Sequence, residues 1–476
     1  MDQAAYDAWV GLAHKALKGA PLDTLNTAFP DGFTLGPLHA PMSPVYSGRP
    51  SAGPWRVVQR IAHDQPPASV VAELMNGADA LSLVFAGAPD AFGAGLTTAT
   101  ADELDSLLGD VMLDHCPIYV SAGARGAGAA ALLSAVVAKR RTPPRELHLG
   151  LDHYGAALAT GQLVAMPIAD AVEAAETHDL EGTVALADGR PVAEAGGTPA
   201  QELAFALAAF ARHMEDLIDA GIEPGTAARR TAMALSASQD QFTTIAKLRA
   251  ARRLHAMVVE AFGTTTALQL WVTTQRRMLS HTDPTTNLLR LTIAAFSAGV
   301  GGADAVTAMP YAPDGRDLTA RMARNIQRLL LEESHLAVIA DPGAGAGAIE
   351  ALTDEIAAAA WASFQTLSHV GLAYSLQEGT VQAQIAAAAE AEAAALSEDA
   401  ATIVGVTKFP PPNDQSAQPI LVEAPQPTGA APPENSVHAL TIAATMGASI
   451  ADLNQPAASV RPLPPTRLSA AQEDAR

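Results

Sequence analysis

The chain has 476 residues, which is long enough for one large barrel domain with appendages or for two or three ordinary domains. Its 29 Lys and Arg residues stand against 50 Asp and Glu residues, giving a formal net charge of -21. This balance argues against a nucleic-acid partner, because a phosphate backbone selects clustered basic side chains. Hydrophobic residues make up 49% of the chain but aromatic residues only 4%, so the core must be built mainly from Ala, Leu, Val and Ile.

Cysteine usage and hydropathy indicate the compartment. Cys116 is the only cysteine, which excludes an internal disulfide and a thiolate metal cluster and fits a reducing compartment. We expect it to be a buried, apolar thiol. The first residues contain no basic segment followed by an apolar run, and no stretch approaches the roughly 20 apolar residues that span a bilayer. A cytoplasmic protein with no membrane partner is therefore predicted.

Short apolar runs alternate with helical stretches, which is the pattern of βα units on a parallel sheet. Both faces of such strands are buried, and this explains why the runs are almost continuously apolar. Eight runs in succession predict an α/β protein with a closed (β/α)8 TIM barrel. The expected strands are Ala80 to Phe85, Pro117 to Ser121, Leu147 to Asp152, Thr183 to Ala187, Ala232 to Ser236, Leu268 to Thr273, Ala303 to Met309 and Leu336 to Asp341.

Two long segments between these strands have apolar residues at helical spacing, Pro199 to Ala220 and Asp240 to Phe262. In the second segment, Lys247, Arg252 and Arg253 are expected to point away from the apolar stripe. The ordinary interpretation of these basic residues is a solvated or salt-bridged face.

Composition sets the expected domain boundaries. Residues 1–55 are rich in Pro and Gly after one amphipathic helix, so they are interpreted as an N-terminal extended arm. Residues 56–380 form the predicted barrel domain, and residues 381–410 a helical extension. Residues 411–476 are dominated by proline, alanine and polar residues, whose low apolar content cannot offset the entropy of ordering. This tail is expected to be extended or disordered, with one short helix from Val437 to Met446. Deleting the residues after about Ala417 is expected to leave the thermal midpoint nearly unchanged.

Generic motifs give few candidates for a site. The sequence has no P-loop, no H-E-x-x-H and no C-x-x-C. The run GARGAG from Gly123 to Gly128 either cradles a phosphate at a helix N-terminus or, more commonly, forms a tight turn. The pairs Asp152 with His153 and Asp114 with His115 lie at or beside predicted strand ends. A barrel places catalytic groups there, so either pair could be an acid–base couple or half of a metal site, but no further ligands occur at metal spacing.

The most specific stretch is DQFTTIAKLRAARRLHAMVVEAFG, from Asp240 to Gly263. It resembles a helix segment of the methylmalonyl-CoA mutase family, D-x-F-x-x-I-A-K-L-R-A-A-R-x-L-W-x-x-V. Further similarities follow in the family's order: LTARMARNIQ from Leu318 to Gln327 is similar to F-S-A-R-I-A-R-N-T-Q, DPGAG from Asp341 to Gly345 to D-P-W-G-G, and GVTKF from Gly405 to Phe409 to G-V-N-K-Y. The resemblance covers roughly residues 6 to 410.

This resemblance implies a known chemistry but altered site residues. Family members rearrange the carbon skeleton of an acyl-CoA with radicals from adenosylcobalamin, which is held between a barrel and a separate cobalamin domain. Catalytic chains carry a Tyr-His pair just before an E-A-G-x-T segment, and here Arg190 and Pro191 occupy those positions. Proline has no proton to give. Pro50 stands where catalytic chains have a tyrosine, five residues before the tryptophan that matches Trp55.

The cobalamin-binding part also departs from the family. The sequence contains no D-x-H-x-x-G, the segment whose histidine ligates cobalt, and the residues after Pro410 are too few and of the wrong composition for a cobalamin domain. The resemblance therefore implies a small, non-catalytic subunit of a heterodimeric methylmalonyl-CoA mutase, with no catalytic, cofactor-binding or metal-binding residues. Its expected partner is the catalytic large subunit, which would bind adenosylcobalamin.

Two other interpretations stay open. One is a barrel subunit of another cobalamin-dependent acyl-CoA mutase, which would use a separate cobalamin-binding protein. A retained Tyr-His pair would favour that enzyme, and its absence speaks against it. The other is a non-enzymatic protein that binds a mutase or its cofactor-loading machinery. A neighbouring gene for a full-length mutase with D-x-H-x-x-G would favour the small-subunit interpretation.

Overall fold

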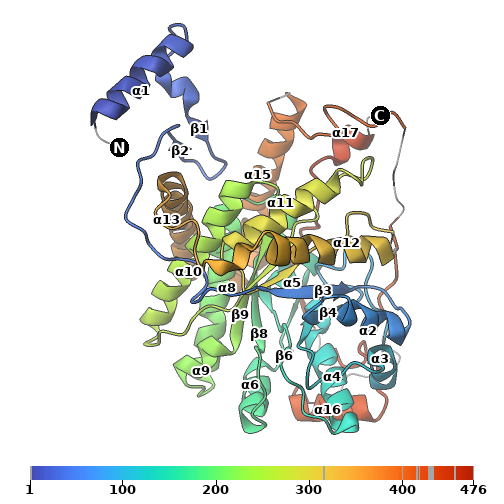
Figure 1. The fold of residues 1–476 in the computed structure, drawn as a ribbon. Coiled ribbons are helices and arrows are strands. Elements are labelled where there is room, and N and C mark those ends of the chain that lie inside the picture. Colours follow the sequence, from blue (N-terminus) through green and yellow to red (C-terminus); the bar gives the residue numbers. More distant parts are fainter. Residues whose placement is uncertain are drawn as a thin grey trace.

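The computed structural model describes residues 3–314, 317–398, 400–413, 416, 419–426, 434–454 and 457–474. At its centre, eight parallel strands form one curled sheet in the order β6-β5-β4-β3-β11-β10-β9-β8 (Figure 1). All residues of β4 and β9 are buried, as expected for strands covered on both faces. The strands are β3 (Arg56–Ile61), β4 (Ala80–Val84), β5 (Ile118–Ser121), β6 (Leu147–His148), β8 (Ala185–Asp188), β9 (Thr231–Ala237), β10 (Leu270–Thr274) and β11 (Ala305–Thr307).

Backbone hydrogen bonds join the two edges of this sheet, just beyond β6 and at β8. The Leu149 N–H donates to the Thr183 carbonyl at 2.9 Å. Leu151 forms a parallel bridge with Ala185, and its carbonyl accepts from the Leu186 N–H at 2.9 Å. The protein is thus of the α/β class, with a curled parallel sheet that is consistent with the predicted TIM-like barrel.

Seven of the eight predicted strands are confirmed, and the eighth is wrong. Residues Leu336–Val338 form a 3-10 turn outside the sheet. The eighth strand of the sheet is instead β3, which lies between β11 and β4. Its sequence, RVVQRI, carries Arg56, Gln59 and Arg60, and these polar residues interrupt the apolar pattern by which the other strands are predicted.

Helices surround the sheet, and the two long predicted helices are confirmed as α8 and α10 (Figure 1). Thr198 caps α8 and Asp240 caps α10, each accepting a hydrogen bond from a backbone N–H in the first turn. No helix in the described ranges is long and apolar enough to cross a bilayer. The helices from β3 onward to residue 397 are α2 (Pro67–Met75), α3 (Ala101–Leu108), α4 (Gly126–Arg140), α5 (Tyr154–Thr160), α6 (Ile168–Thr177), α7 (Arg190–Glu194), α8 (Pro199–Asp219), α9 (Pro224–Arg229), α10 (Gln241–Ala261), α11 (Asn287–Val300), α12 (Asp317–Arg328), α13 (Gly347–Val370), α14 (Leu372–Glu378) and α15 (Thr380–Ser397).

The basic residues of α10 form salt bridges to neighbouring elements. Lys247 is buried against the Glu202 carboxylate of α8, so its predicted outward orientation is wrong. Arg252 pairs with Asp304 at 2.9 Å, and Arg253 pairs with a carboxylate of α13. Of the two ordinary interpretations, the salt-bridged face is therefore confirmed and the solvated face is not. Cys116 is buried, as predicted.

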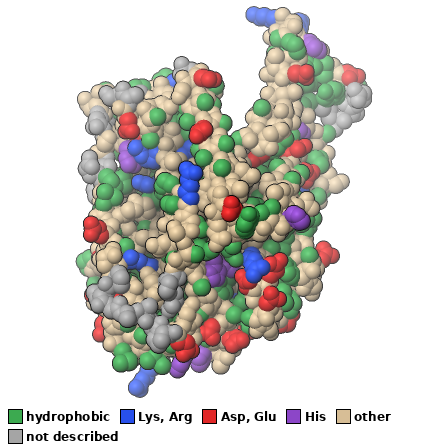
Figure 2. Space-filling model, turned by 180° about the vertical axis from the view of Figure 1, so that it is seen from behind, with side chains coloured by type: hydrophobic (Ala, Val, Ile, Leu, Met, Phe, Trp, Pro, Cys, Tyr) green, Lys and Arg blue, Asp and Glu red, His purple; other side chains and the backbone are tan. Residues whose placement is uncertain are grey.

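The beginning of the N-terminal arm stands away from the rest of the molecule (Figures 1 and 2). It consists of α1 (Gln3–Ala16). The small hairpin of β1 (Thr27–Ala28) and β2 (Thr34–Leu35) that follows contacts the barrel, where Asp31 accepts a 3.2 Å hydrogen bond from the Ala200 N–H and Phe29 and Phe33 pack on the core. Apolar side chains of α1 are left in solvent, with Leu12 68% and Tyr6 41% exposed. Such exposed apolar groups on a projecting segment are typical of a surface that meets another protein.

The C-terminal region packs on the barrel, so the predicted unpacked tail is wrong for the segments that the structure describes. The predicted short helix is confirmed as α16 (Val437–Thr445), which lies against α4 (Figure 1). Leu440, Ile450 and Leu453 are at most 1% exposed. Farther on, β12 (Ala457–Ser459) pairs with β7 (Gln162–Val164), and α17 (Ala470–Asp474) follows. A few well-spaced apolar residues thus anchor a segment whose average composition predicts disorder.

Removing residues 437–474 is consequently expected to lower the thermal unfolding midpoint by roughly 10 °C or more. Each buried apolar side chain contributes about 1.5–3 kcal/mol, and 1 kcal/mol corresponds to a few degrees in a large domain. Calorimetry of the intact and truncated chains measures the shift. Leu440→Ala is expected to lower the midpoint, whereas Met446→Ala, at a position 83% exposed, is not. Equal midpoints for the intact and truncated chains would contradict this packing.

Candidate functional site

Large side chains from the strands fill the inside of the curled sheet. Tyr119 of β5 and His148 of β6 stack with ring centroids 4.1 Å apart, and Trp271 of β10 meets both rings edge-on at 5.0 and 5.1 Å. Arg56, at the start of β3, donates a 2.8 Å hydrogen bond to the Tyr119 hydroxyl. Its guanidinium also forms an ion pair with Glu146 at 2.8 Å. We call these five residues, Arg56, Tyr119, Glu146, His148 and Trp271, the interior cluster.

Each charge in the interior cluster has a partner. Burial disfavours the Glu146 carboxylate, but hydrogen bonds from His148 and Arg56 more than offset it and lower the pKa of Glu146 to about 2. Burial lowers the pKa of His148 in spite of Glu146, so the imidazole is neutral near pH 7. Burial also raises the pKa of Tyr119 above its ordinary value. The charged groups of the cluster thus satisfy one another along the barrel axis, and the Trp271 indole N–H is left without a hydrogen-bond acceptor.

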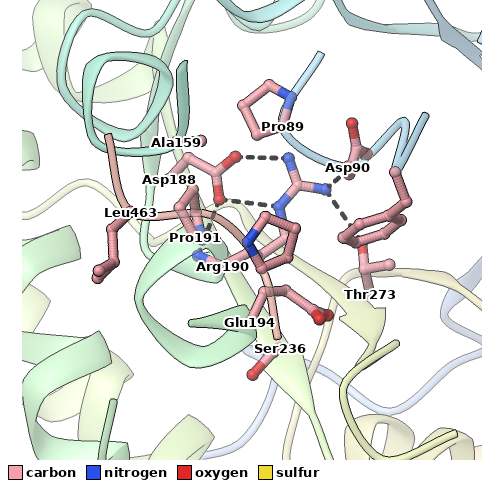
Figure 3. Close-up of a pocket in the computed structure, with 12 residues that line it drawn as sticks. Pro89, Asp90, Ala159, Asp188, Arg190, Pro191, Glu194, Ser236, Thr273 and Leu463 are labelled. Atoms are coloured by element: carbon pink, nitrogen blue, oxygen red, sulfur yellow. Dashed lines mark hydrogen bonds and ion pairs between the residues drawn. The ribbon is translucent and has the colours of Figure 1, made fainter. Parts of the chain in front are cut away.

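A second group of charges lies at the carboxyl ends of the strands (Figure 3). Arg190 begins α7, and its guanidinium donates to both carboxylate oxygens of Asp188, the last residue of β8, at 2.8 and 2.7 Å. Its Nη1 also lies 3.3 Å from Asp90 and donates to the Thr273 hydroxyl at 3.1 Å. Arg60 of β3 approaches Asp90 from the other side, at 3.5 Å. We call Arg60, Asp90, Asp188 and Arg190 the rim cluster.

The rim cluster is buried and electrically paired. Burial disfavours the charge on Arg190, but Asp188 and Asp90 outweigh it and raise the pKa of Arg190. Burial likewise acts to raise the pKa of Asp90, yet Arg190 and Arg60 hold it below its ordinary value. The cavity beside these groups has a volume of only about 20 Å³ and is lined by Leu463 of the C-terminal region (Figure 3). Such an arrangement fixes charges in place and leaves little room for a substrate.

The structure places the three positions singled out by the family resemblance at two ends of the barrel. Arg190 lies in the rim cluster, and Pro191 lines the same small cavity with a ring that carries no hydrogen-bonding side-chain group. Pro50 is exposed in the loop that precedes β3, at the end where the strands begin. Arg190 and Pro191 are therefore brought together, and Pro50 is not near them.

The two candidate Asp-His pairs have structural surroundings. Asp152 accepts three backbone N–H hydrogen bonds of 2.9 to 3.1 Å at the start of α5, and the His153 ring bonds a backbone carbonyl at 2.8 Å. Asp114 and His115 are exposed in a turn before β5, at the opposite end of the strands. Within the described part of the chain, no group of three His, Cys, Asp or Glu side chains is arranged to hold a metal ion.

The glycine run from Gly123 to Gly128 forms the tight turn that is the commoner interpretation. Gly123 has φ +54°, and a Cβ there would lie 2.7 Å from the ring of Pro89. Gly128 is covered by the C-terminal region, since a Cβ there would lie 2.9 Å from the Ile450 carbonyl. A phosphate has no access to this helix start.

Asp152 offers a pH-dependent test of the buried charges. Burial, and after it the Asp188 carboxylate, raise the pKa of Asp152 to about 8. The folded state then holds the proton more tightly than the unfolded state, so the contribution to stability is full below the unfolded pKa of about 4 and is lost as the pH rises through about 8. Asp152→Asn keeps a neutral acceptor for the start of α5.

The expected result is a flatter fall of the unfolding midpoint between about pH 4 and pH 8 in Asp152→Asn than in the unchanged chain. Thermal melts in a series of buffers measure it. Asp219→Asn, the same chemical change at an exposed position at the end of α8, serves as the control and should leave the slope as it was. An identical slope in all three proteins would contradict the raised pKa.

Sequence reasoning missed the interior cluster and three members of the rim cluster. Tyr119, His148 and Trp271 each stand alone in an apolar run, and only the parallel register brings them together. Asp90 and Arg190 are 100 positions apart in the chain. The available signal was a polar or aromatic residue within or just after each strand. Such a residue is expected to face the barrel axis or the rim, but the sequence does not show which residues it contacts there.

Comparisons with known proteins agree with this scaffold. Residues 77–446 match the family model described as Methylmalonyl-CoA mutase. The chain is 35% identical over 449 residues to the methylmalonyl-CoA mutase small subunit of Streptomyces virginiae, covering 90% of this chain and 69% of that protein. It is 34% identical over 403 residues to the probable small subunit of Mycobacterium bovis, covering 79% and 63% of the two chains.

A third relative is the methylmalonyl-CoA mutase small subunit of Propionibacterium freudenreichii subsp. shermanii, 31% identical over 372 residues. That match covers 72% of this chain and 56% of the relative, so the chain spans between about half and two thirds of the length of the relatives it matches. A family match over most of the chain and relatives that share about a third of its residues together show that it belongs to the methylmalonyl-CoA mutase family.

Proposed function

We propose that this chain is the small, non-catalytic subunit of an adenosylcobalamin-dependent methylmalonyl-CoA mutase. In this proposal a large-subunit partner carries out the isomerisation of methylmalonyl-CoA and succinyl-CoA. The observation that carries the proposal is the filled barrel, in which the interior cluster occupies the axis and the rim cluster closes the end of the strands. The relatives named above, each called a small subunit, support it.

The residues at the Tyr-His positions support a lack of catalysis. A general acid must lose its proton near the working pH, within hydrogen-bond reach of the substrate. Arg190 does neither, because its raised pKa keeps it protonated and two carboxylates hold its donors. Pro191 carries no side-chain proton at all. We therefore assign no catalytic residue to this chain.

Adenosylcobalamin is assigned to the partner on the same grounds. In barrels the reacting groups meet at the carboxyl ends of the strands. Here part of that end is covered by the C-terminal region, with Leu463 and Pro465 over the rim cluster and Pro419 with Ile420 over the neighbouring cavity. A larger cavity of about 600 Å³ lies beside the ends of β9 and β10, lined by Ser236 and Gln275. The covering residues do not fit a corrin ring. The radical chemistry that the cofactor supplies would consequently take place on the large subunit.

The exposed arm is the proposed contact with the large subunit. On α1, Tyr6 and Trp9 have ring centroids 6.1 Å apart, and Leu12 lies exposed on the same helix. In the hairpin, Phe29 and Phe33 stack at 4.8 Å and pack partly on the barrel core, so they attach the arm to the barrel and α1 carries the exposed side chains. Aromatic and aliphatic side chains on a projecting element suit an interface of the permanent kind, which buries more than roughly 2,000 Å².

Co-expression with a catalytic large subunit, followed by pull-down, tests this contact. The intact chain is expected to capture the large subunit stoichiometrically, and a chain without residues 1–40 at least about 10-fold less, because buried aromatic anchors dominate such interfaces. Leu12→Asp is expected to weaken capture. Met112→Asp, at a position 63% exposed in the turn before β5, is the matched control for Leu12, which is 68% exposed.

The outcomes separate two claims. If the truncated chain is soluble and captures the large subunit as well as the intact chain does, the arm is not the contact, but the subunit proposal stands. If no form of the chain captures the large subunit, the small-subunit proposal is wrong.

A further inference from the structure

A second cavity at the carboxyl ends of the strands is lined by cationic side chains. It has a volume of about 90 Å³ and lies beside β3, β10 and β11, beneath Pro419 and Ile420 of the C-terminal region. Its basic lining residues are Arg60, His63, Arg276, His281 and Arg467. Among the described residues that line it, none is an Asp or a Glu. Arg60 pairs with Asp90 and Arg467 with Glu473, whereas the Arg276 guanidinium has no carboxylate partner among the described residues and favours an anion.

Several donors in this cavity have no acceptor. Nη1 of Arg60, a side chain only 5% exposed, makes no hydrogen bond, although a carboxylate oxygen of Asp90 lies 3.5 Å away. The Arg276 guanidinium lies 4.8 Å from the centre of the Phe92 ring and forms no hydrogen bond or ion pair within the described part of the chain. The rings of His63 and His281 likewise form no hydrogen bond with described residues.

Arg190, the other arginine of the rim cluster, differs from Arg60 in this respect. Its side-chain donors meet Asp188, Asp90 or a hydroxyl. Buried donors without acceptors are rare in folded proteins, because each costs the desolvation of a polar group. Nη1 of Arg60 is such a buried donor, and the half-buried side chains of Arg276, His63 and His281 bring further donors to the same cavity. Together they indicate an acceptor that comes from outside the chain.

We propose that this cavity binds a phosphate-type oxyanion, held chiefly by Arg60 and Arg276 and completed by His63 and His281. A phosphoryl group presents several oxygens in different directions, and guanidinium groups bind it with charge-assisted hydrogen bonds. The ligand is inorganic phosphate or the phosphoryl group of a small phosphomonoester. On one side the cavity is bounded by Ile420, whose N–H donates to the Pro313 carbonyl at 3.1 Å. Phosphate binding here requires no catalytic role and no partner.

Calorimetric titration of the full-length chain tests the site, in a phosphate-free buffer of low ionic strength. Inorganic phosphate and glycerol 3-phosphate are titrated separately. We expect one site with a Kd below about 1 mM for at least one of them. Arg276→Gln removes a charged donor whose contact within the described chain is the Phe92 ring, so it should weaken binding by about 10-fold or more. The matched control, Arg212→Gln, changes an exposed arginine of α8 and should leave binding unchanged.

The two ligands distinguish the sources of the oxyanion. Binding of inorganic phosphate identifies the free ion as sufficient, whereas binding of glycerol 3-phosphate alone points to a phosphorylated metabolite. His281→Asn provides a second variant, expected to weaken binding less than Arg276→Gln does. No heat with either ligand at concentrations of about 10 mM, or equal binding by the unchanged chain and Arg276→Gln, would overturn the proposal. Capture of the large subunit is unaffected by either outcome.

Discussion

Arg249→Ala is expected to lower the free energy of unfolding by about 3–5 kcal/mol, because it breaks a buried ion pair by removing one partner. The Arg249 side chain, in the middle of α10, is fully buried. It forms ion pairs with Asp341 and Glu350 and donates to the Val45 carbonyl at 3.1 Å. Its loss would leave the Asp341 and Glu350 carboxylates in the interior. Only Glu350 would then keep an arginine partner, Arg253.

Urea denaturation followed by circular dichroism measures this effect. Arg249→Lys keeps the charge but loses the planar, two-headed geometry, so an intermediate loss is expected. Arg212→Ala is the matched control, since Arg212 is exposed and its ion pairs with Glu215 and Asp216 on the surface of α8 contribute at most about 1 kcal/mol. A loss at Arg249 no larger than that at Arg212 would show that the buried network does not hold α10, α13 and the arm together.

This network also explains what the family motifs do in this chain. Arg249 belongs to the KLRAAR segment and Asp341 to DPGAG, so two separate motifs meet in one buried ion pair. In the same way, Gln327 of LTARMARNIQ accepts a 3.2 Å hydrogen bond from the Trp55 indole, and Arg324 of that motif pairs with Glu73. The motifs that identify the family thus hold the scaffold, which is why they can persist where site residues have changed.

Strands with continuous apolar runs and helices with clear caps could be predicted from the sequence. Each depends on local pattern, as at Thr198 and Asp240, which cap α8 and α10. β3 could not be predicted from the same pattern. Its Arg56 and Arg60 pair with Glu146, just before β6, and with Asp90, in the loop after β4, and these partners come close only once the sheet is assembled. The apolar run at Leu336–Val338 has no neighbouring strand to pair with.

The C-terminal region shows the limit of composition. Its proline and alanine content predicts a disordered segment, but the segment is ordered where single apolar residues pack on the barrel. Leu440 and Ile450 pack against α3 and α4 and are buried there. Ile420 and Leu463 reach the rim at the carboxyl ends of the strands, where they cover cavities. A local window of the sequence does not show which distant element such a residue will contact.

The central claim concerns the barrel, and its largest expected effect is the complete absence of activity in the isolated chain. An acyl-CoA would have to displace the interior cluster, in which Tyr119, His148 and Trp271 are stacked and Arg56 is paired with Glu146. At the rim, Arg190 and Pro191 supply no proton for catalysis. With the carboxyl ends of the strands partly covered, the isolated chain is also expected not to retain adenosylcobalamin.

The most direct test is to incubate the purified full-length chain by itself with adenosylcobalamin, remove free cofactor by gel filtration, and record the absorbance spectrum and the turnover of methylmalonyl-CoA. The same measurements on the co-purified complex with a catalytic large subunit serve as the positive control. The account predicts no cobalamin spectrum and no succinyl-CoA from the isolated chain, and both from the complex. Stoichiometric cobalamin or measurable turnover with the isolated chain would contradict it.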